Sequence, residues 1–331
     1  MKLLITGSAG FIGMSTSMAF LKQNYTVIGI DNLNSFYDIR LKIDRNNELK
    51  KFKKYKFYNF DISKNDEKLK SIIKKHKIKI VLHLAAQANV RYSLKNPRAY
   101  IRNNIVGFYN IIEACRELKV EKFIFASSSS VYGKNYKVKN FFSENDKTDT
   151  PKNLYAATKK SNEVIAYAYS DLFNINTVGL RFFTVYGPWG RPDMAPFIFL
   201  KSILERKTIK IFNSGKMFRD FTYIDDVVNA IVKITQRRLT NKKNFYKILN
   251  IGRGKSENLM NFIKIMESTI DMKSKKKYLP LQMGDMVLTQ ANIKELKKFI
   301  KYTPRTELKV GLKKFCDWYI DYYKYNKKFS S

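Results

Sequence analysis

The chain has 331 residues, of which 44% are hydrophobic, and its 63 Lys and Arg against 28 Asp and Glu give a formal net charge of +35. This length can bury a large core and predicts a main domain joined to a smaller one. No apolar run approaches the roughly 18 residues that cross a bilayer, and no secretory leader precedes the first predicted strand. We therefore expect a cytoplasmic protein without membrane insertion.

Two cysteines, Cys115 and Cys316, and two histidines argue against a disulfide framework and against a Cys/His metal site. The charge is compatible with nucleic-acid binding, but the lysines are scattered in pairs and short runs rather than in one stripe. We expect no specific nucleic-acid partner. A positive field would still attract a polyanionic substrate.

The first half of the chain alternates short apolar runs with amphipathic segments, a pattern that predicts β-α-β units and a parallel sheet. The predicted strands are Lys2–Thr6, Thr26–Ile30, Lys56–Phe60, Ile80–Leu84, Lys122–Ala126 and Asn176–Arg181. The predicted helices are Phe11–Lys22, Asp66–Lys75, Pro97–Leu118 and Asn153–Phe173.

The alternation is less regular in the second half. Helices are predicted near Met194–Glu205, Asp225–Thr235, Leu259–Ile270, Ile293–Lys298 and Val310–Tyr325, with short strands between them. The expected fold class is α/β: a Rossmann-type doubly wound parallel sheet over residues 1–185, to which 221–251 return. Residues 186–220 and 252–331 would form a smaller mixed α/β C-terminal domain that binds the substrate.

A glycine-rich segment, Gly7-Ser8-Ala9-Gly10-Phe11-Ile12-Gly13, lies between the first predicted strand and the first predicted helix. Glycines let the backbone approach a pyrophosphate, and a helix N-terminus attracts its negative charge. Asp31 follows at the end of the second strand, about 20 residues on, as in dinucleotide-binding folds. Its carboxylate can accept hydrogen bonds from a ribose and would repel a 2′-phosphate, which favours NAD over NADP. Asp31 could instead cap a turn.

Tyr155 and Lys159 lie four residues apart, so their side chains share one face of the predicted helix. A neighbouring ammonium favours the phenolate, and Tyr155 could then act as a base below the usual pKa of a tyrosine. The alternative is a packed aromatic ring near a solvated lysine.

Together, the glycine segment, Ser127-Ser128-Ser129-Ser130-Val131-Tyr132-Gly133 and the Tyr155–Lys159 pair resemble the extended short-chain dehydrogenase/reductases of the NAD-dependent epimerase/dehydratase family. The resemblance implies that Ser128, Tyr155 and Lys159 are catalytic. Members of this family act on nucleotide sugars. By the resemblance, Tyr155 would take the proton of the 4-hydroxyl of the sugar, Ser128 would hydrogen-bond the reacting oxygen, and Lys159 would hold the nicotinamide ribose. The implied NAD contacts are Gly7, Gly10, Phe11, Ile12, Gly13, Asp31, Asn32, Asp61, Ile62, Leu84, Ala85, Ala86, Asn104, Tyr155 and Lys159.

Ser129 and Ser130 stand where dehydratases of this family place an Asp-Glu pair. A serine hydroxyl cannot supply acid and base at neutral pH, so dehydration is disfavoured. Return of the hydride to the opposite face of the ketone would give 4-epimerisation. Long collinear segments, 83–93, 154–160, 180–194, 219–226 and 250–254, resemble the UDP-glucuronate 4-epimerases.

This resemblance implies a UDP-sugar substrate whose carboxylate is bound by Thr184 and Arg191, with added donors from Ser129 and Ser130. Arg219 would pair with the diphosphate, Phe212 would lie near uracil, and Asp285 near the ribose or a diphosphate-binding arginine.

The resemblance also implies a homodimer in which the two long helices, near 97–118 and 153–173, form a four-helix bundle. Those helices could instead only cover the sheet. The alternative functions are UDP-glucuronate decarboxylase, UDP-glucose 4-epimerase and, more remotely, a non-catalytic nucleic-acid-binding protein.

Overall fold

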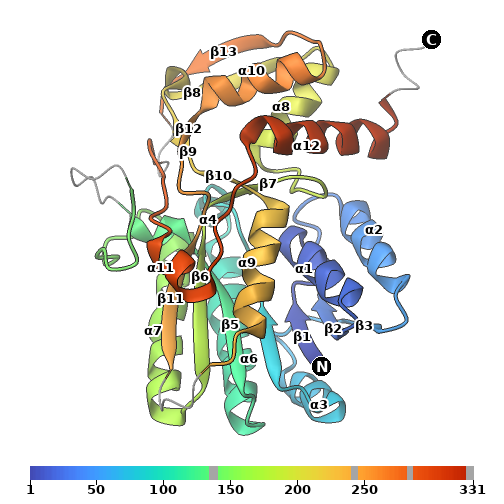
Figure 1. Ribbon diagram of the computed structural model, residues 1–331, viewed down its shortest axis with the longest axis vertical. Helices are drawn as coiled ribbons and strands as arrows, with labels where there is room; N and C mark the ends of the chain where they lie inside the picture. Colours follow the sequence, from blue (N-terminus) through green and yellow to red (C-terminus); the bar gives the residue numbers. More distant parts are fainter. Residues whose placement is uncertain (134–140, 240–244, 282–285, 326–331) are drawn as a thin grey trace.

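A seven-stranded parallel sheet forms the centre of the larger part of the molecule (Figure 1). The computed structural model describes residues 1–133, 141–239, 245–281 and 286–325. The strands are β1 (Lys2–Thr6), β2 (Thr26–Asp31), β3 (Tyr55–Asn59), β4 (Ile80–His83), β5 (Lys122–Ser128), β6 (Asn176–Phe182) and β11 (Tyr246–Ile251). Their order is β11-β6-β5-β4-β1-β2-β3.

The strand order reverses beside β1, because the chain passes through β2 and β3 on one side and returns through β4, β5 and β6 on the other. Ligands of open α/β sheets bind at the carboxyl ends of the strands at such a switch point. This topology confirms the predicted Rossmann-type doubly wound sheet, and the six strands predicted in the first half all form.

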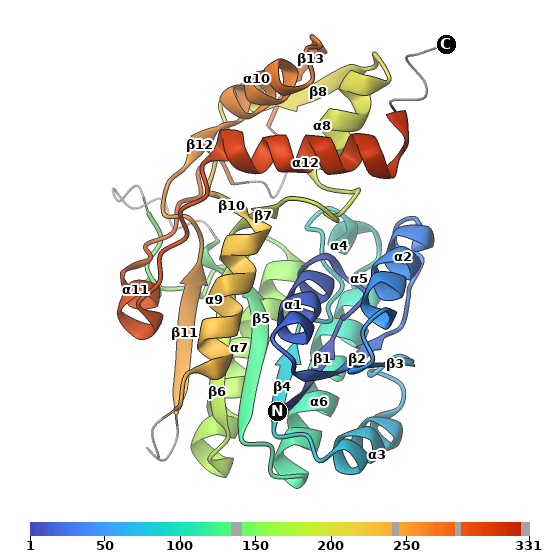
Figure 2. The ribbon, with the colours of Figure 1, turned by 45° about the vertical axis from the view of Figure 1, so that its right-hand side comes forward.

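Helices cover both faces of the sheet (Figure 2). The alternation of side chains along β1 sends Leu3 and Ile5 to one face and Leu4 to the other, where separate apolar cores lie. One face is covered by α1 (Phe11–Lys22), α2 (Ile39–Lys50) and α9 (Ile224–Gln236), and the opposite face by α3 (Asp66–His76), α6 (Gly107–Glu117) and α7 (Leu154–Phe173).

The helix predicted over 97–118 forms without a break as α5 (Pro97–Tyr100), a π-helical segment, Ile101–Val106, and α6. A separate short helix, α4 (Tyr92–Lys95), precedes it. Asn96 caps α5 by accepting a hydrogen bond from the Ala99 amide at 3.3 Å, and Pro97 occupies its first turn. Proline at that position fits a helix start, so a new helix begins here.

The smaller part lies beyond the carboxyl ends of the main strands (Figures 1 and 2). It contains the helices α8 (Ala195–Leu204), α10 (Leu259–Thr269) and α12 (Leu308–Tyr322). Its strand pairs are β8 (Thr208–Phe212) with β13 (Lys275–Leu279), and β9 (Phe218–Arg219) with β12 (Glu257–Asn258). The pair of β7 (Thr184–Tyr186) with β10 (Phe221–Tyr223) lies between the two parts, and α11 (Lys294–Ile300) packs beside β11.

We propose the predicted division, with residues 1–185 and 221–251 in the larger part and residues 186–220 and 252–331 in the smaller part, except that α11 lies with the larger part beside β11. Among the described residues, every helix is too short or too polar to span a bilayer.

Candidate active site

A pocket of about 430 Å³ lies at the carboxyl ends of the central strands. Its lining comes from the main sheet and from the segments that lead into the smaller part, and this volume is in the range of small-molecule sites. The sequence-predicted residues that line it are Gly7, Gly10, Phe11, Ile12, Gly13, Asp31, Asn32, Asp61, Ile62, Leu84, Ala85, Ala86, Ser128, Ser129, Ser130, Tyr155, Lys159, Thr184, Arg191 and Arg219.

The glycines of the glycine segment leave no room for a side chain at their own positions. Gly7 has a φ of +71°, and a Cβ there would lie 2.7 Å from the Ala85 nitrogen. A Cβ on Gly13 would lie 2.0 Å from the Gly7 carbonyl oxygen. Gly10 stands at the N-cap of α1, where no side chain caps the helix amides. This bare helix N-terminus at the pocket wall fits a dinucleotide pyrophosphate.

Asp31 combines the two roles that the sequence left open. Its Oδ1 accepts a hydrogen bond from the Leu33 amide at 2.9 Å and its Oδ2 one from the Ala9 amide at 3.1 Å, so it does close a turn. It also lines the pocket, with acceptor capacity left on both oxygens for a ribose. Burial raises the pKa of Asp31 and lowers that of Lys42, beside it, to about 8.

Asn104 departs from the predicted contact with the cofactor, since it is not part of the pocket lining. It is buried, and its Nδ2 donates to the Gln87 carbonyl and to the Thr158 hydroxyl, both at 3.0 Å. Its Oδ1 accepts from the Gln87 amide at 2.8 Å. Asn104 therefore holds the backbone of Gln87, which does line the pocket.

Ser128, Tyr155 and Lys159 meet in this pocket. Ser128 ends β5, and Tyr155 stands in the first turn of α7, which begins where the Asn153 side chain accepts a hydrogen bond from the Ala156 amide at 2.9 Å. Burial raises the pKa of Tyr155, while the hydrogen bond with Ser128 acts in the opposite direction.

Lys159 follows Tyr155 by four residues on α7, and its predicted effect on the Tyr155 pKa stays a prediction. Its Nζ donates to the Ala126 carbonyl at 2.8 Å, and burial lowers its own pKa to about 8. The positive group that lowers the Tyr155 pKa here is Arg191, from the loop before α8.

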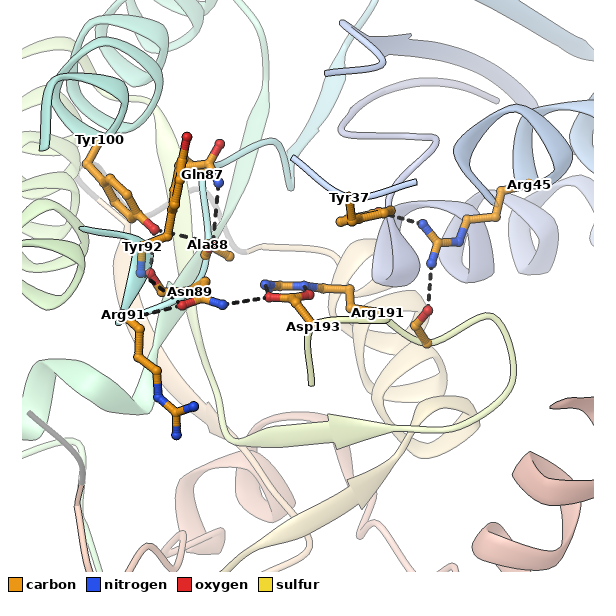
Figure 3. A network of polar contacts seen from close by, with 11 residues as sticks. Tyr37, Arg45, Gln87, Ala88, Asn89, Arg91, Tyr92, Tyr100, Arg191 and Asp193 are labelled. Carbon is orange, nitrogen blue, oxygen red and sulfur yellow. Dashed lines mark hydrogen bonds and ion pairs between the residues drawn. The ribbon is translucent and has the colours of Figure 1, made fainter. Parts of the chain in front are cut away.

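Arg191 is bound by Asp193, which is in turn bound by Asn89 (Figure 3). Neither Asp193 nor Asn89 was predicted from the sequence as a site residue. The Nε and Nη2 of Arg191 donate to the two oxygens of Asp193 at 3.0 and 2.5 Å. The Asn89 Nδ2 donates to Asp193 Oδ2 at 2.9 Å. Asn89 and Asp193 are 104 positions apart, so no local pattern could have linked them.

Arg45, on α2, is a further missed residue. Its side chain is fully buried and donates to the carbonyls of Trp189 at 2.6 Å, Gly190 at 2.8 Å and Ala9 at 3.2 Å. One guanidinium thus ties the glycine segment to the loop that carries Arg191.

Of the three residues predicted to bind the nucleotide, one lines the pocket. Arg219 lines the pocket, and its Nη1 donates to the Val287 carbonyl at 3.1 Å. Phe212 ends β8 outside this lining, and the Arg91 guanidinium lies over its ring at 5.1 Å. Asp285 lies outside the described residues.

Known proteins are similar to this chain over nearly its whole length. The chain is 45% identical to the protein CapI of Staphylococcus aureus over 98% of this chain and 100% of that protein. It is 43% identical to a UDP-glucuronate 4-epimerase of Thermodesulfobacterium geofontis over 95% of both chains. A crystal structure of UDP-glucuronic acid 4-epimerase from Bacillus cereus, in complex with UDP-glucuronic acid and NAD, superposes with a TM-score of 0.90 at 35% identity, covering 98% of this chain and 100% of that one.

The sequence pattern of the NAD dependent epimerase/dehydratase family matches residues 3–252. The geometry agrees with this match, since Gly7, Gly10 and Gly13, Asp31 and the Tyr155–Lys159 pair all line one pocket. The chain therefore belongs to the NAD dependent epimerase/dehydratase family and is an enzyme whose cofactor is NAD.

Proposed function

We propose that this NAD-dependent nucleotide-sugar epimerase is a UDP-glucuronate 4-epimerase, which interconverts UDP-glucuronate and UDP-galacturonate. The observation that carries the proposal is the position of Arg191, a cation that lines the same pocket as Ser128 and Tyr155 and affects the Tyr155 pKa. A guanidinium this close to the reacting centre suits a sugar with a carboxylate. The names of the Thermodesulfobacterium geofontis relative and of the Bacillus cereus structure support the same substrate.

In the proposed reaction, the phenolate of Tyr155, which Arg191 and the Ser128 hydroxyl favour against the effect of burial, takes the proton of the sugar 4-hydroxyl while the Ser128 hydroxyl hydrogen-bonds that oxygen. Bound NAD accepts the hydride of C4 and later returns it. Lys159, on the same face of α7 as Tyr155, would hold the nicotinamide ribose. Tyr155 then gives the proton back to O4 when the hydride reaches the opposite face of the ketone, and the configuration at C4 is inverted.

Inversion requires the keto sugar to turn while the nucleotide stays fixed. We propose that Arg219 holds the diphosphate, Phe212 lies near uracil, and Asp285 contributes to the same end of the site. Fixed binding of the nucleotide keeps the intermediate at a high effective concentration beside the reacting groups.

The side chains that follow Ser128 disfavour dehydration. Ser129 and Ser130 line the pocket, and the Ser130 hydroxyl donates to the Ser128 hydroxyl at 2.9 Å. Neither serine can act as the acid or base that elimination of water needs at neutral pH.

The 4-keto uronate is a β-keto acid and can lose carbon dioxide. The C5–C6 bond can break when it stands perpendicular to the plane of the C4 carbonyl. The electron pair of that bond then forms the C4–C5 enolate as carbon dioxide leaves, and C5 later takes a proton. We propose that Thr184, Arg191, Ser129 and Ser130 hold the carboxylate near the carbonyl plane until the hydride returns.

The test is to incubate the purified protein separately with UDP-glucuronate, UDP-glucose and UDP-xylose, with no added NAD, and to resolve the products. The proposal predicts UDP-galacturonate from UDP-glucuronate and little turnover of the two other sugars. UDP-xylose formed from UDP-glucuronate would identify a decarboxylase, and turnover of UDP-glucose alone would identify a UDP-glucose 4-epimerase.

We also propose a homodimer formed through the outer faces of α6 and α7. These two helices pack side by side, and apolar side chains on them are exposed to solvent. The exposed set is Tyr109, Val164, Tyr167, Leu172 and Phe173. A second copy that packs the same two helices against this face would cover it and form a four-helix bundle.

A further inference from the structure

The guanidinium of Arg191 has two edges, and Asp193 occupies one of them. The occupied edge carries Nε and Nη2, which bind the two Asp193 oxygens. The other edge carries Nη1 and the second hydrogen of Nη2. Nη1 has no hydrogen-bond partner within the part of the chain that the structure describes, and the Arg191 side chain is 20% exposed and lines the pocket.

Asp193 is in turn fixed by Asn89 (Figure 3). The Asn89 side chain is used at both ends, since its Nδ2 donates to Asp193 while its Oδ1 accepts from the amides of Arg91 at 2.9 Å and Tyr92 at 3.1 Å. The Tyr100 hydroxyl donates to the Asn89 carbonyl. These contacts fix the Asn89 amide within the segment that passes the pocket.

The backbone of Asn89 is itself unusual, with a φ of +104°. Side-chain-bearing residues seldom adopt this conformation, and such strain persists where the surrounding contacts hold it in place. Asparagine at this position keeps an amide directed at Asp193, which glycine, better suited to the φ, would lack.

We propose that Asn89 and Asp193 are positioning residues that hold the Arg191 guanidinium in one orientation, with its Nη1 edge toward the carboxylate of the sugar. This inference rests on the proposed function, because only an acidic sugar brings a carboxylate to that edge. Asp193 and the sugar then bind the two edges of one guanidinium, and Asn89 keeps Asp193 from following the sugar when it turns.

The contacts of Asn89 and Asp193 with Arg191 would determine whether the keto intermediate is reduced to the epimer or loses carbon dioxide. An arginine side chain without this support can rotate with the carboxylate, and the C5–C6 bond can then reach the perpendicular orientation in which carbon dioxide leaves. A guanidinium fixed through Asp193 and Asn89 restrains the carboxylate during the same interval. The predicted signature is a change in the ratio of products rather than a simple loss of rate.

The experiment compares the full-length parent with Asn89→Gly and Asp193→Asn. Glycine accepts the positive φ and removes only the side-chain contacts, so Asn89→Gly retains the local backbone. Asp193→Asn keeps the shape of the side chain and removes its charge. Asp317→Asn is the matched control, because Asp317 forms an exposed ion pair with Lys313 on α12, in the smaller part.

Each protein is incubated with UDP-glucuronate, and the decarboxylated UDP-pentose products and UDP-galacturonate are quantified, together with the KM for UDP-glucuronate. Loss of one charge-assisted hydrogen bond is expected to raise the ratio of decarboxylated product to epimer by about tenfold in Asn89→Gly, and by more in Asp193→Asn. The control should keep the parental ratio.

The two proposals fail in different ways. If the parent makes UDP-galacturonate and both variants keep its product ratio and KM, the positioning role is wrong while the function stands. If the parent turns over UDP-glucose and not UDP-glucuronate, the proposed function is wrong, and the role of Asn89 and Asp193 in holding a carboxylate-binding arginine fails with it.

Discussion

Burial governs the charge of the reacting side chains. It raises the pKa of Tyr155 and lowers that of Lys159 to about 8, so both groups are shifted toward their neutral forms. The sequence could place the phenol and the amine on one helix face, because that follows from helical periodicity. It could not give the degree of burial or the Ala126 carbonyl that binds Lys159, because both depend on strand β5.

A buried histidine gives a test of residue-scale electrostatics in the main sheet. His83 is 1% exposed, its Nδ1 lies 2.8 Å from the Thr6 hydroxyl, and burial lowers its pKa to about 3. The unfolded chain binds a proton at this residue near pH 6.5, so it holds more protons than the folded state between about pH 3 and 6.5. Stability from His83 is thus fully present above pH 6.5 and is lost as the pH falls toward 3.

Replacing His83 by asparagine removes this loss. Between pH 6.5 and about 4.5, the parent should lose roughly 2–3 kcal/mol more free energy of unfolding than His83→Asn, measured by urea unfolding at each pH. His76 is less buried, and His76→Asn should give a smaller difference. Parallel stability curves for the parent and His83→Asn would show that His83 titrates normally in the folded protein.

At the scale of elements, the predictions were accurate where apolar periodicity was strong and failed where polar side chains are buried. The helix α3, whose apolar residues Leu69, Ile72 and Ile73 recur on one face, is predicted to within one residue of its observed end, whereas α2 is not predicted. That helix buries Leu41 and Leu49 but also Lys42, Arg45 and Asn46, so its sequence lacks a clear apolar face. The same polar residues make α2 important to the site, through the Arg45 contacts with Ala9, Trp189 and Gly190.

The glycine segment connects β1 to α1, and a substitution in it is expected to weaken NAD binding. Gly13→Ala would place a Cβ 2.0 Å from a backbone oxygen, so the glycine segment must shift and bind NAD less well. The purified variant should retain less than about a tenth of the parental NAD, as expected when phosphate contacts of 1–3 kcal/mol are lost. NAD is released by denaturation and quantified by chromatography.

Gly107→Ala is the matched control. A Cβ there meets Ile62 at 3.5 Å, an ordinary contact, and alanine is the better helix former. Its NAD content should equal that of the parent. Equal NAD in Gly13→Ala would show that the close approach at Gly13 is not needed for cofactor binding.

At the scale of the whole molecule, the site depends on contacts between distant parts of the chain. The β-α-β alternation of the sequence was sufficient to predict the sheet and the end at which a ligand binds. The pairing of Asn89 with Asp193, and of Arg45 with Trp189, joins segments more than a hundred residues apart and could be seen only in the folded chain.

The proposed dimer gives a prediction at this scale. Val164 is 56% exposed on α7, and Val164→Glu would place a charge at the centre of the proposed four-helix bundle. We expect this variant to sediment as a monomer at concentrations where the parent is a dimer. Ile198→Glu, on α8 and 46% exposed, should leave the parental state unchanged. A dimeric Val164→Glu protein would place the interface elsewhere.

Retention of the C4 hydrogen tests the central claim most directly. The protein is incubated, without added NAD, with UDP-glucuronate that carries deuterium at C4, and the UDP-galacturonate formed is analysed by mass spectrometry and NMR. If the same hydride leaves and returns at the pocket formed by Ser128, Tyr155 and Lys159, the deuterium stays at C4 in the inverted product, and Tyr155→Phe forms this product at least about a hundredfold more slowly. Solvent hydrogen at C4 of the product, or an undiminished rate in Tyr155→Phe, would contradict the account.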